Sequence, residues 1–583
     1  QIDIVGNKIY SDKQLVSLFD TSTPRWNSWL TKSDQYDRDK LQADIDRLES
    51  FYRDRGFMDF AVTSTQVSLS PDRKWIYLTV NVDEGKVYRV KGYQLQGDLI
   101  VPRTELESLI TFKPGDRYNR SEVRKSTDAL RTRLADEGYA QAQVNVVPNA
   151  DKLSGEVSFD ILVTPGIKTY VRQIGFTGNT KTYDRVLRRE LRQQEASLYS
   201  GSDVARSEER LRRLPQVETL EQAIHPVPGT PDQVDLEYKI TERSTSSIQG
   251  GVGYGQSSGA LFNLEYNDNN FLGTGNSLGI NFGKSSSEQR YGFDFTDPYF
   301  TADGVSINYA FDYSKTNYRK ERLSDWAADT LDATITFGYP LTEYQSVYFG
   351  GGFRTLKINT GDNVASEITD YLNKKGRRYK EGVVTLAWNK DTQDNTYLPT
   401  KGSLNKISGE ITLPGSDDTY YKIGYRNRTY FPLNDDKSLI LGLRGDIAYG
   451  GGYGKTDDLP FYRHYYAGGL TTVRGFEHSS LGPRYSNGDT SGGDFRTVGG
   501  VELMTPWKIN EKSNNVRVGT FIDFGNVYSK PKDFDLGEFR YSGGLFVQWM
   551  SPLGPLNLSY AVPIKKKDGD EKEAFQFSFG MGF

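Results

Sequence analysis

The chain has 583 residues, a net charge of −4 and 36% hydrophobic residues, yet it carries 38 Tyr, 30 Phe and 59 Gly. It has no Cys and no run of 18 apolar residues, which argues against disulfides, thiolate chemistry and a transmembrane helix. The charge balance and the lack of a basic stripe give no support to a nucleic-acid partner. Its three histidines lack metal-ligand spacing, and no nucleophile lies near a base, so we expect no metal, no cofactor and no enzymatic activity.

The first 243 residues contain three copies of one unit. Each copy opens with a short strand-like run that ends in Gly-Asn or Gly-Asp, at residues 2–7, 93–98 and 174–179. A segment with the apolar periodicity of a helix follows each run, as in the stripe Leu41, Ile45, Leu48 and Tyr52. Two further strands close each copy. The pattern predicts three small βααββ domains over residues 1–88, 89–167 and 168–243.

The sheets of such domains have exposed edges, and an extended peptide can pair with an exposed edge as an added strand. The repeats could therefore bind other chains or serve only as spacers. The third copy lacks the Gly-aromatic pair that follows the helix in the other two, and has Leu214-Pro215 there instead.

From residue 244 onward the pattern changes to strict alternation of apolar and polar residues. In residues 306–314, for example, Tyr309 and Phe311 alternate with Asn308, Ala310 and Asp312. Turn sequences rich in Pro, Gly and Asp separate these runs. Alternation without helical stripes predicts an antiparallel transmembrane β-barrel over residues 244–583, and its length allows about 14–18 strands.

The last nine residues show the alternation most clearly. Phe575, Phe577, Phe579, Met581 and Phe583 share one face, opposite small or polar residues. One face against lipid requires this arrangement, whereas packing against a second soluble sheet is the alternative.

One loop of the predicted barrel, residues 460–483, has an unusual centre: Val473, Arg474, Gly475 and Phe476. A barrel of this size encloses water unless something fills it. Glu502 and Asp523 lie between apolar neighbours in the strands that follow, so we expect both carboxylates to face the lumen. An inward-folded loop would pair Arg474 with them through charge-assisted hydrogen bonds. Arg474→Glu should then cripple function, and a charge swap at Asp523 should restore it in part.

These features together resemble the BamA family, the central subunits of the outer-membrane β-barrel assembly machinery of Gram-negative bacteria. The resemblance rests on the three repeats, on residues 473–476 and on the sequence Trp-Met-Ser-Pro-Leu-Gly-Pro-Leu at 549–556. It implies that the repeats are polypeptide-transport-associated (POTRA) domains in the periplasm, and that the barrel has sixteen strands in the outer membrane.

The resemblance also implies a lateral seam between the first and last strands, through which client barrels are folded and inserted. The seam residues it points to are Gly250, Gly251, Gly253 and Gly255 in the first strand, and Phe579, Gly580 and Phe583 in the last. Glu195 falls where the last POTRA domain of the family meets a lipoprotein. The implied partners are lipoprotein subunits, unfolded outer-membrane barrel clients, periplasmic chaperones and the lipid bilayer.

Two alternatives remain open. An export pore of the two-partner secretion type shares the architecture, but usually has two POTRA domains and a plugging helix. The second alternative is an export protein of the TamA type, which would account for three POTRA domains. Members of the BamA family usually have five, so we expect these to be the three nearest the barrel, and we expect a processed or trimmed N-terminus at Gln1.

Overall fold

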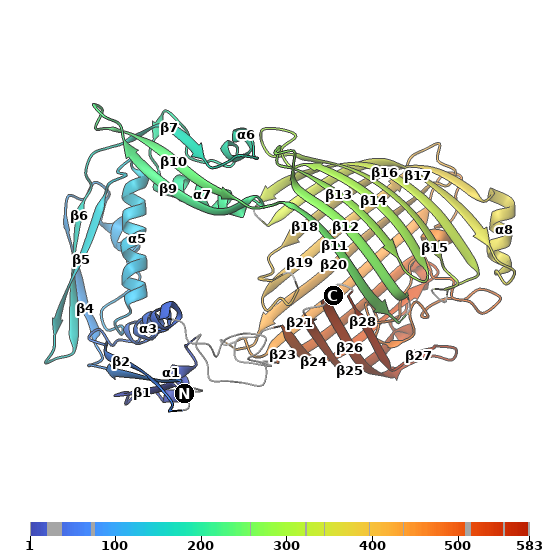
Figure 1. Cartoon of the computed structure of the whole chain (residues 1–583). Helices are drawn as coiled ribbons and strands as arrows, with labels where there is room; N and C mark the ends of the chain where they lie inside the picture. The colour runs from blue at the N-terminus through green and yellow to red at the C-terminus, as the bar shows by residue number, and fades with distance from the viewer. Residues whose placement is uncertain are drawn as a thin grey trace. The chain divides into compact units, whose positions relative to one another are not determined.

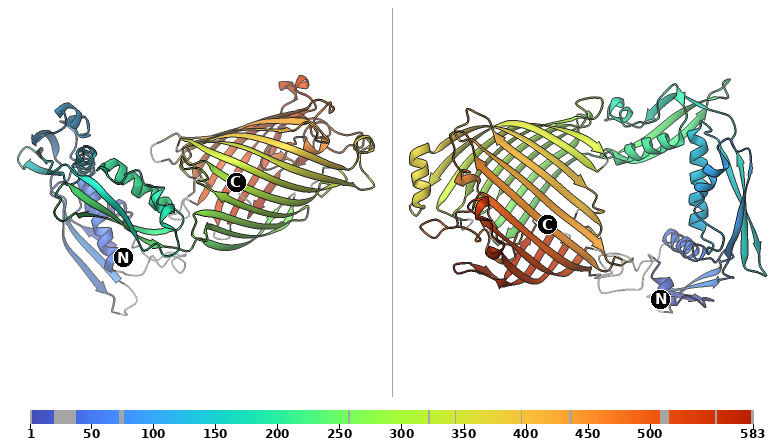
Figure 2. Two further views of the ribbon diagram at one scale, coloured as in Figure 1. Left: turned by 90° about the horizontal axis from the view of Figure 1, so that it is seen from above. Right: turned by 180° about the vertical axis from the view of Figure 1, so that it is seen from behind.

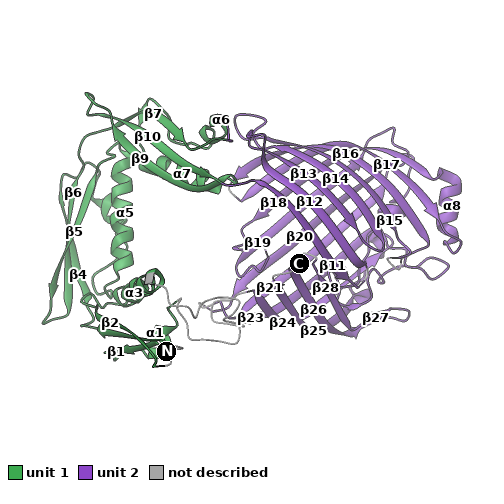
Figure 3. Cartoon of the chain, viewed as in Figure 1, with its two compact units in different colours: residues 1–180, 184–242 green, residues 181–183, 243–583 purple. Residues whose placement is uncertain are grey.

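The computed structural model describes residues 2–19, 38–71, 76–256, 258–320, 323–342, 344–395, 397–434, 437–507, 515–551 and 554–580. They divide into two compact units, one formed by residues 1–180 and 184–242, the other by residues 181–183 and 243–583 (Figure 3).

The first unit contains three α+β repeats (Figure 1). The first repeat comprises β1 (Ile2–Val5), α1 (Asp12–Val16), α3 (Arg38–Arg53), β2 (Ala61–Leu69) and β3 (Ile76–Asp83). The second comprises β4 (Arg89–Gly97), α4 (Arg103–Ser108), α5 (Arg120–Asp136), β5 (Gln143–Asp151) and β6 (Glu156–Thr164). The third comprises β7 (Tyr170–Thr177), α6 (Asp184–Arg188), β8 (Ser197–Leu198), α7 (Gly201–Arg213), β9 (Val217–Pro226) and β10 (Gln233–Glu242). No helix among the described residues is long and apolar enough to cross a membrane.

The three sheets share one topology. In each, the last strand lies in the middle, parallel to the first strand of the repeat and antiparallel to the strand before it. The opening Gly-Asn or Gly-Asp turn has a common cause: a Cβ on Gly6, Gly97 or Gly178 would lie 2.0–2.1 Å from a carbonyl oxygen of the middle strand. Only glycine fits there.

Each repeat has its own apolar core. The helical stripe predicted in the first repeat is buried, with Leu48 and Tyr52 fully covered. In the third repeat, α7 ends without a glycine cap. Leu214 is extended at the helix end because Pro215 disfavours a helical conformation in the residue before it.

Sixteen strands of the second unit close into an antiparallel barrel, which confirms the predicted fold (Figure 2). In order around the barrel they are β11 (Ser246–Gly255), β12 (Gly259–Phe271), β13 (Asn276–Lys284), β14 (Glu288–Asp297), β15 (Ser306–Asn317), β16 (Trp326–Thr342), β17 (Gln345–Thr360), β18 (Arg378–Asp391), β19 (Gly402–Thr412), β20 (Tyr420–Pro432), β21 (Ile440–Gly452), β23 (Phe495–Pro506), β24 (Val516–Tyr528), β25 (Arg540–Ser551), β26 (Gly554–Lys565) and β28 (Phe575–Phe579).

Shorter elements lie in the connections between barrel strands. They are α8 (Ser366–Lys375), the 3₁₀ turns η1 (Phe461–Arg463), η2 (Pro531–Asp533) and η3 (Leu536–Glu538), and the strands β22 (Gly475–Phe476) and β27 (Lys572–Glu573). Strands β22 and β27 pair with each other and not with the barrel sheet. The connection between β21 and β23 contains η1 and β22, and we refer to its residues 453–494 as the interior loop.

The outer face of the barrel carries the apolar residues of the alternating pattern. Tyr309, Phe311 and Ile335 are 42–48% exposed, while polar side chains alternate with them along the same strands. Large apolar groups exposed to this extent over many adjacent strands fit a lipid environment.

Candidate functional site

The centre of the interior loop is buried inside the barrel. Val473 and Phe476 have no exposed surface and Arg474 is 5% exposed. Val473 and Phe476 pack with Ala467 and Leu481 of the same loop against Val498 and Val527 of the barrel wall. The loop therefore brings its own small apolar core to the wall formed by β23 and β24.

Arg474 makes a bidentate contact with Asp523 of β24 and a further contact with Glu502 of β23. Its Nε lies 2.7 Å from Asp523 Oδ2, and its Nη2 lies 2.9 Å from Asp523 Oδ1 and 2.6 Å from Glu502 Oε1. The guanidinium carbon lies 3.4 Å from the ring centroid of Phe521, so the cation also stacks on an aromatic face. The structure thus brings together the three charged residues that the sequence singled out.

The ring of Phe521 and the side chain of Arg444 are parts of this site that the sequence analysis missed. Arg444 of β21 donates to Asp523 over 2.7 Å and to the loop carbonyls of Thr471 and Thr472 over 3.0 and 2.6 Å. Two arginines therefore face two carboxylates, and charge balance makes the burial of all four tolerable. The signal was available, because Arg444 alternates with the outward Leu443 along its strand.

Gly475 brings the loop close to β26. Its φ is +86°, and a Cβ there would lie 3.0 Å from Cβ of Ala561. Both the left-handed backbone and the narrow gap favour glycine at this position. The docking that buries Arg474 and Phe476 thus also requires a glycine at position 475.

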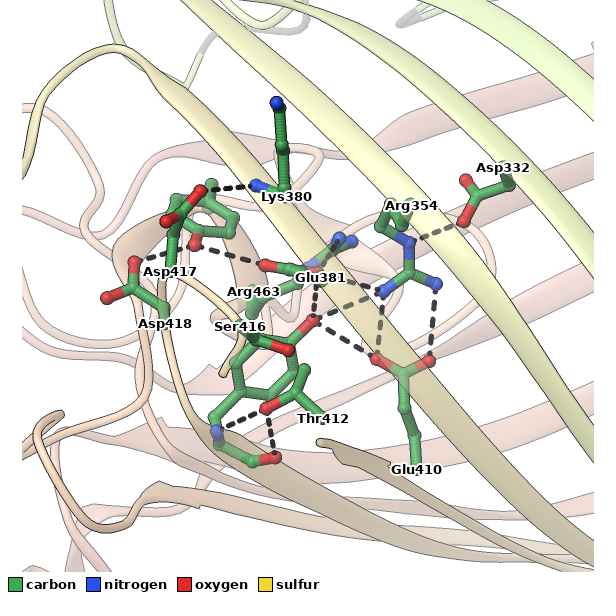
Figure 4. Close-up of polar contacts among 12 residues, drawn as sticks. Asp332, Arg354, Lys380, Glu381, Glu410, Thr412, Ser416, Asp417, Asp418 and Arg463 are labelled. Carbon is green, nitrogen blue, oxygen red and sulfur yellow. Dashed lines mark hydrogen bonds and ion pairs between the residues drawn. The ribbon is translucent and has the colours of Figure 1, made fainter. Parts of the chain in front are cut away.

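A second charged cluster holds the start of the interior loop (Figure 4). Glu381 of β18 is fully buried and accepts hydrogen bonds from Tyr420, Tyr462 and Arg463, with Arg354 at 3.5 Å. Asp418, also fully buried, accepts from Tyr462 and from Tyr371 and Lys375 of α8. Arg354 further contacts Asp332 and Glu410. Charged clusters therefore attach the interior loop to the barrel near residue 463 and at residue 474.

Among the residues that the structure describes, which end at 580, the first and last barrel strands meet over two residue pairs. Tyr254 pairs with Phe579 and Gly255 with Ser578, whereas β11 pairs with β12 over all ten of its residues. Residues 246–253 of β11 consequently have no paired strand among the described residues on the side facing β28.

Gly253 and Gly580, both predicted at the seam, each lie against the backbone of the opposite side of the seam. A Cβ on Gly253 would lie 2.5 Å from the carbonyl oxygen of Phe579, and one on Gly580 would lie 2.8 Å from that of Val252. Gly250 and Gly251 belong to the part of β11 that β28 does not pair. Phe583 lies outside the described residues.

Glu195 contributes to the shape of its own loop in the third repeat. Its Oε1 accepts from the backbone N–H of Ile174 over 2.8 Å and from Arg188 over 3.0 Å, while its side chain is 43% exposed. These hydrogen bonds, first that of Ile174, hold the pKa of the Glu195 carboxyl below its ordinary value.

The fold and the interior loop define the class of protein: a β-barrel membrane protein with N-terminal POTRA domains. Residues 270–583 match the model of the Omp85 superfamily domain, and residues 1–85, 88–166 and 169–243 match the POTRA model, described as surface antigen variable number repeat. The barrel lies in the outer membrane and the POTRA domains lie in the periplasm.

The relatives found among known proteins narrow this class. The chain is 34% identical to the outer membrane protein assembly factor BamA of Neisseria meningitidis serogroup B, covering 100% of this chain and 78% of that protein. It is 25% identical to BamA of Nitratidesulfovibrio vulgaris, covering 100% and 72%. The crystal structure of BamA from Haemophilus ducreyi lacking POTRA domains 1–3 matches with a TM-score of 0.73 at 34% identity, covering 85% of this chain and 100% of that one. The chain belongs to the BamA family of the Omp85 superfamily.

Proposed function

We propose that this protein folds β-barrel proteins and inserts them into the outer membrane through the seam between β11 and β28. The observation that carries the proposal is the short ladder between β11 and β28: among the described residues it has two pairs, and residues 246–253 of β11 pair there with no strand on that side. Unpaired N–H and C=O groups along such an edge can template the strand of another chain.

The interior loop supports this reading over that of an export pore. Val473 and Phe476 pack against the lumen face of β23 and β24, and two charged clusters hold the loop in place. A polypeptide that passed through the lumen would have to displace these buried contacts, whereas a client strand at the seam would not have to pass through them.

We assign the POTRA domains the reception of clients and the docking of lipoprotein subunits. Strands β2 and β5 are sheet edges with mostly exposed side chains, so each can accept an extended segment. Glu195 is our candidate for lipoprotein docking. Glu195→Lys should abolish co-purification of a lipoprotein subunit, while Arg188→Ala, which loosens the same loop but keeps the carboxylate, should retain most of it. Equal loss in both variants would assign Glu195 a structural role only.

The decisive experiment is client assembly in liposomes, with and without candidate lipoprotein subunits. An unfolded outer-membrane barrel is added, and its folding is followed by heat-modifiable gel mobility. Because the chain has no Cys, a Tyr254→Cys/Phe579→Cys pair can lock the seam by a single disulfide. We expect the protein to accelerate client folding and the lock to abolish that acceleration.

A matched lock between two ordinary neighbours, Leu331→Cys/Thr355→Cys on β16 and β17, should leave client folding unchanged. Client folding that continues with the seam locked would overturn the proposal. Passage of a soluble polypeptide through the seam-locked barrel would establish an export pore instead.

A further inference from the structure

Side chains extend the closure of the seam beyond its two backbone pairs. Gln256 follows β11 directly, at the outer end of that strand, since the periplasmic domains precede its other end. Its Nε2 donates to the carbonyl oxygen of Phe575 over 3.1 Å, and its Oε1 accepts from the N–H of Phe577 over 3.2 Å. A primary amide offers the same donor and acceptor as a peptide group, so this side chain acts as an additional residue of the ladder between β11 and β28.

A second glutamine makes the same kind of contact with the interior loop. Gln576 of β28 is 2% exposed and points into the barrel. Its Nε2 donates to the carbonyl oxygen of Phe476 over 2.7 Å, and its Oε1 accepts from the N–H of Gly475 over 3.2 Å. The last strand therefore holds the loop next to Arg474 through one buried amide.

Glu573 joins the two glutamines. Its Oε1 accepts from Gln256 Nε2 over 2.7 Å and its Oε2 accepts from Gln576 Nε2 over 3.2 Å. Glu573 also belongs to β27, whose backbone pairs with Gly475 and Phe476 of β22. One carboxylate thus receives a charge-assisted hydrogen bond from each side of the seam. A continuous path of hydrogen bonds runs from the interior loop through β28 to β11.

We propose that Gln256, Glu573 and Gln576 form a latch that keeps the outer end of the seam closed and couples its opening to release of the interior loop. These three are positioning residues: they act on client insertion only through the seam strands and the loop. The proposal rests on the proposed function for its biological meaning, but its physical content can be measured without a client.

Backbone hydrogen exchange of the full-length protein in liposomes measures the opening directly. Gln256→Ala removes three hydrogen bonds of the side chain. Seam amides within residues 251–256 and 575–580 should then exchange at least about tenfold faster, since one hydrogen bond of ordinary net strength already approaches that factor. The amide of Gly475 should accelerate as well, although Gln256 does not contact it. Unchanged exchange at the seam would overturn the latch, and a faster seam with an unchanged Gly475 would overturn the coupling.

A charge swap separates a latch from a general loss of stability. Gln256→Glu places a carboxylate against Glu573 and should open the seam more than Gln256→Ala does. Adding Glu573→Gln restores a donor and an acceptor between residues 256 and 573, although not the donor to the carbonyl oxygen of Phe575, so the double variant should exchange more slowly at the seam than Gln256→Glu alone. Failure of this rescue would overturn the role assigned to Glu573.

Two controls complete the test. Gln289→Ala removes a glutamine at the outer end of β14, where its side chain contacts Tyr291 of the same strand, and should leave the seam unchanged. The exchange of β16 and β17 should stay constant in all variants. If the seam lock leaves client folding intact, the proposed function fails while the exchange results still decide the latch. If the lock stops folding but Gln256→Glu leaves the exchange unchanged, the latch alone fails.

Discussion

At the scale of single residues, the buried charges of the interior loop are balanced rather than merely paired. Arg474 and Arg444 together face Asp523 and Glu502. Both arginines contact the carboxylate of Asp523, and Arg474 also contacts Glu502. Loss of one member leaves its partners desolvated without compensation, which is the costly situation for a buried ion pair.

We expect Arg474→Glu to lower the unfolding free energy by about 3–5 kcal/mol and to abolish client assembly, because three carboxylates would then share one dry site. Arg474→Lys keeps the charge but loses the bidentate geometry and the stacking on Phe521, so it should be intermediate. The measurement is the temperature at which the folded gel band converts to the unfolded one, beside the liposome assay. Unchanged values in Arg474→Glu would refute the role of the pair.

The geometry also changes where a charge swap should work. Sequence reasoning placed the compensating change at Asp523, but an introduced cation there would face Arg444 at a distance that now holds a salt bridge. We therefore expect Glu502→Arg to rescue Arg474→Glu better than Asp523→Arg does. Equal rescue at the two positions would show that Arg444 adapts to a neighbouring cation.

The lowered pKa of Glu195 predicts that the local stability of the third POTRA domain depends on pH. Its pKa is lower in the folded state than the ordinary value of 4.5, so its contribution to stability is present above pH 4.5 and is lost as the pH falls through the folded pKa. The amide of Ile174 should therefore lose protection, relative to its intrinsic exchange rate, between pH 6 and pH 3. In Glu195→Ala its protection should be low at every pH, and identical profiles would contradict this account.

At the scale of elements, α8, β18 and the start of the interior loop depend on the cluster around Glu381. Sequence patterns do not reveal it, because its members come from strands and connections between residues 332 and 463. The hydroxyl of Tyr462 lies 2.8 Å from Asp418 and 3.2 Å from Glu381, so its one hydrogen is shared between the two buried carboxylates. Displacement of η1 would remove this donor from between them.

Glu381→Gln should weaken this attachment, since Arg463 loses its charged partner and Arg354 keeps only Asp332 and Glu410. We expect faster proteolysis of the interior loop near residue 461. The conversion temperature should also fall, because breaking a buried ion pair lowers the unfolding free energy by about 3–5 kcal/mol. Asp312→Asn is the matched control, because its partner Arg290 is 54% exposed and surface pairs contribute about 0–1 kcal/mol. Equal effects of both substitutions would contradict the role of burial.

At the scale of the whole molecule, the barrel is closed unevenly. Within the described part of the chain, strands β16 and β17 pair over sixteen residues, whereas β11 and β28 pair over two. Stability in such a sheet follows the ladder, so local opening should concentrate at the seam.

Hydrogen exchange of the unmodified protein tests this unevenness. Amide groups of an antiparallel strand point alternately to either side. Within residues 246–253 of β11, amides that face β12 should be protected, while those that face the seam should exchange near their free rates. Protection of both sets, as in β16 and β17, would mean that β28 or another chain covers the edge.

The sequence by itself determined the repeats and the barrel, and it singled out Glu502 and Asp523 as candidate partners of Arg474. Periodicity reports which face of a strand or helix is apolar, and the Gly-Asn turns report a backbone that only glycine can adopt. The lumen-facing positions of Glu502 and Asp523 followed from their apolar neighbours. The prediction of sixteen strands came from the family resemblance, because the length of the barrel segment alone allowed about 14–18.

Only the tertiary structure decided which polar groups meet across the barrel. Alternation with Leu443 assigns Arg444 to the inner face, but only the closed barrel places it against Asp523. Gln256, Glu573 and Gln576 carried no signal in the sequence. Their meeting depends on the register of β11 against β28, which is set by two residue pairs and by the docking of a loop about 100 residues earlier. Alternation fixes the face on which a side chain lies, but the contacts it makes depend on register and closure.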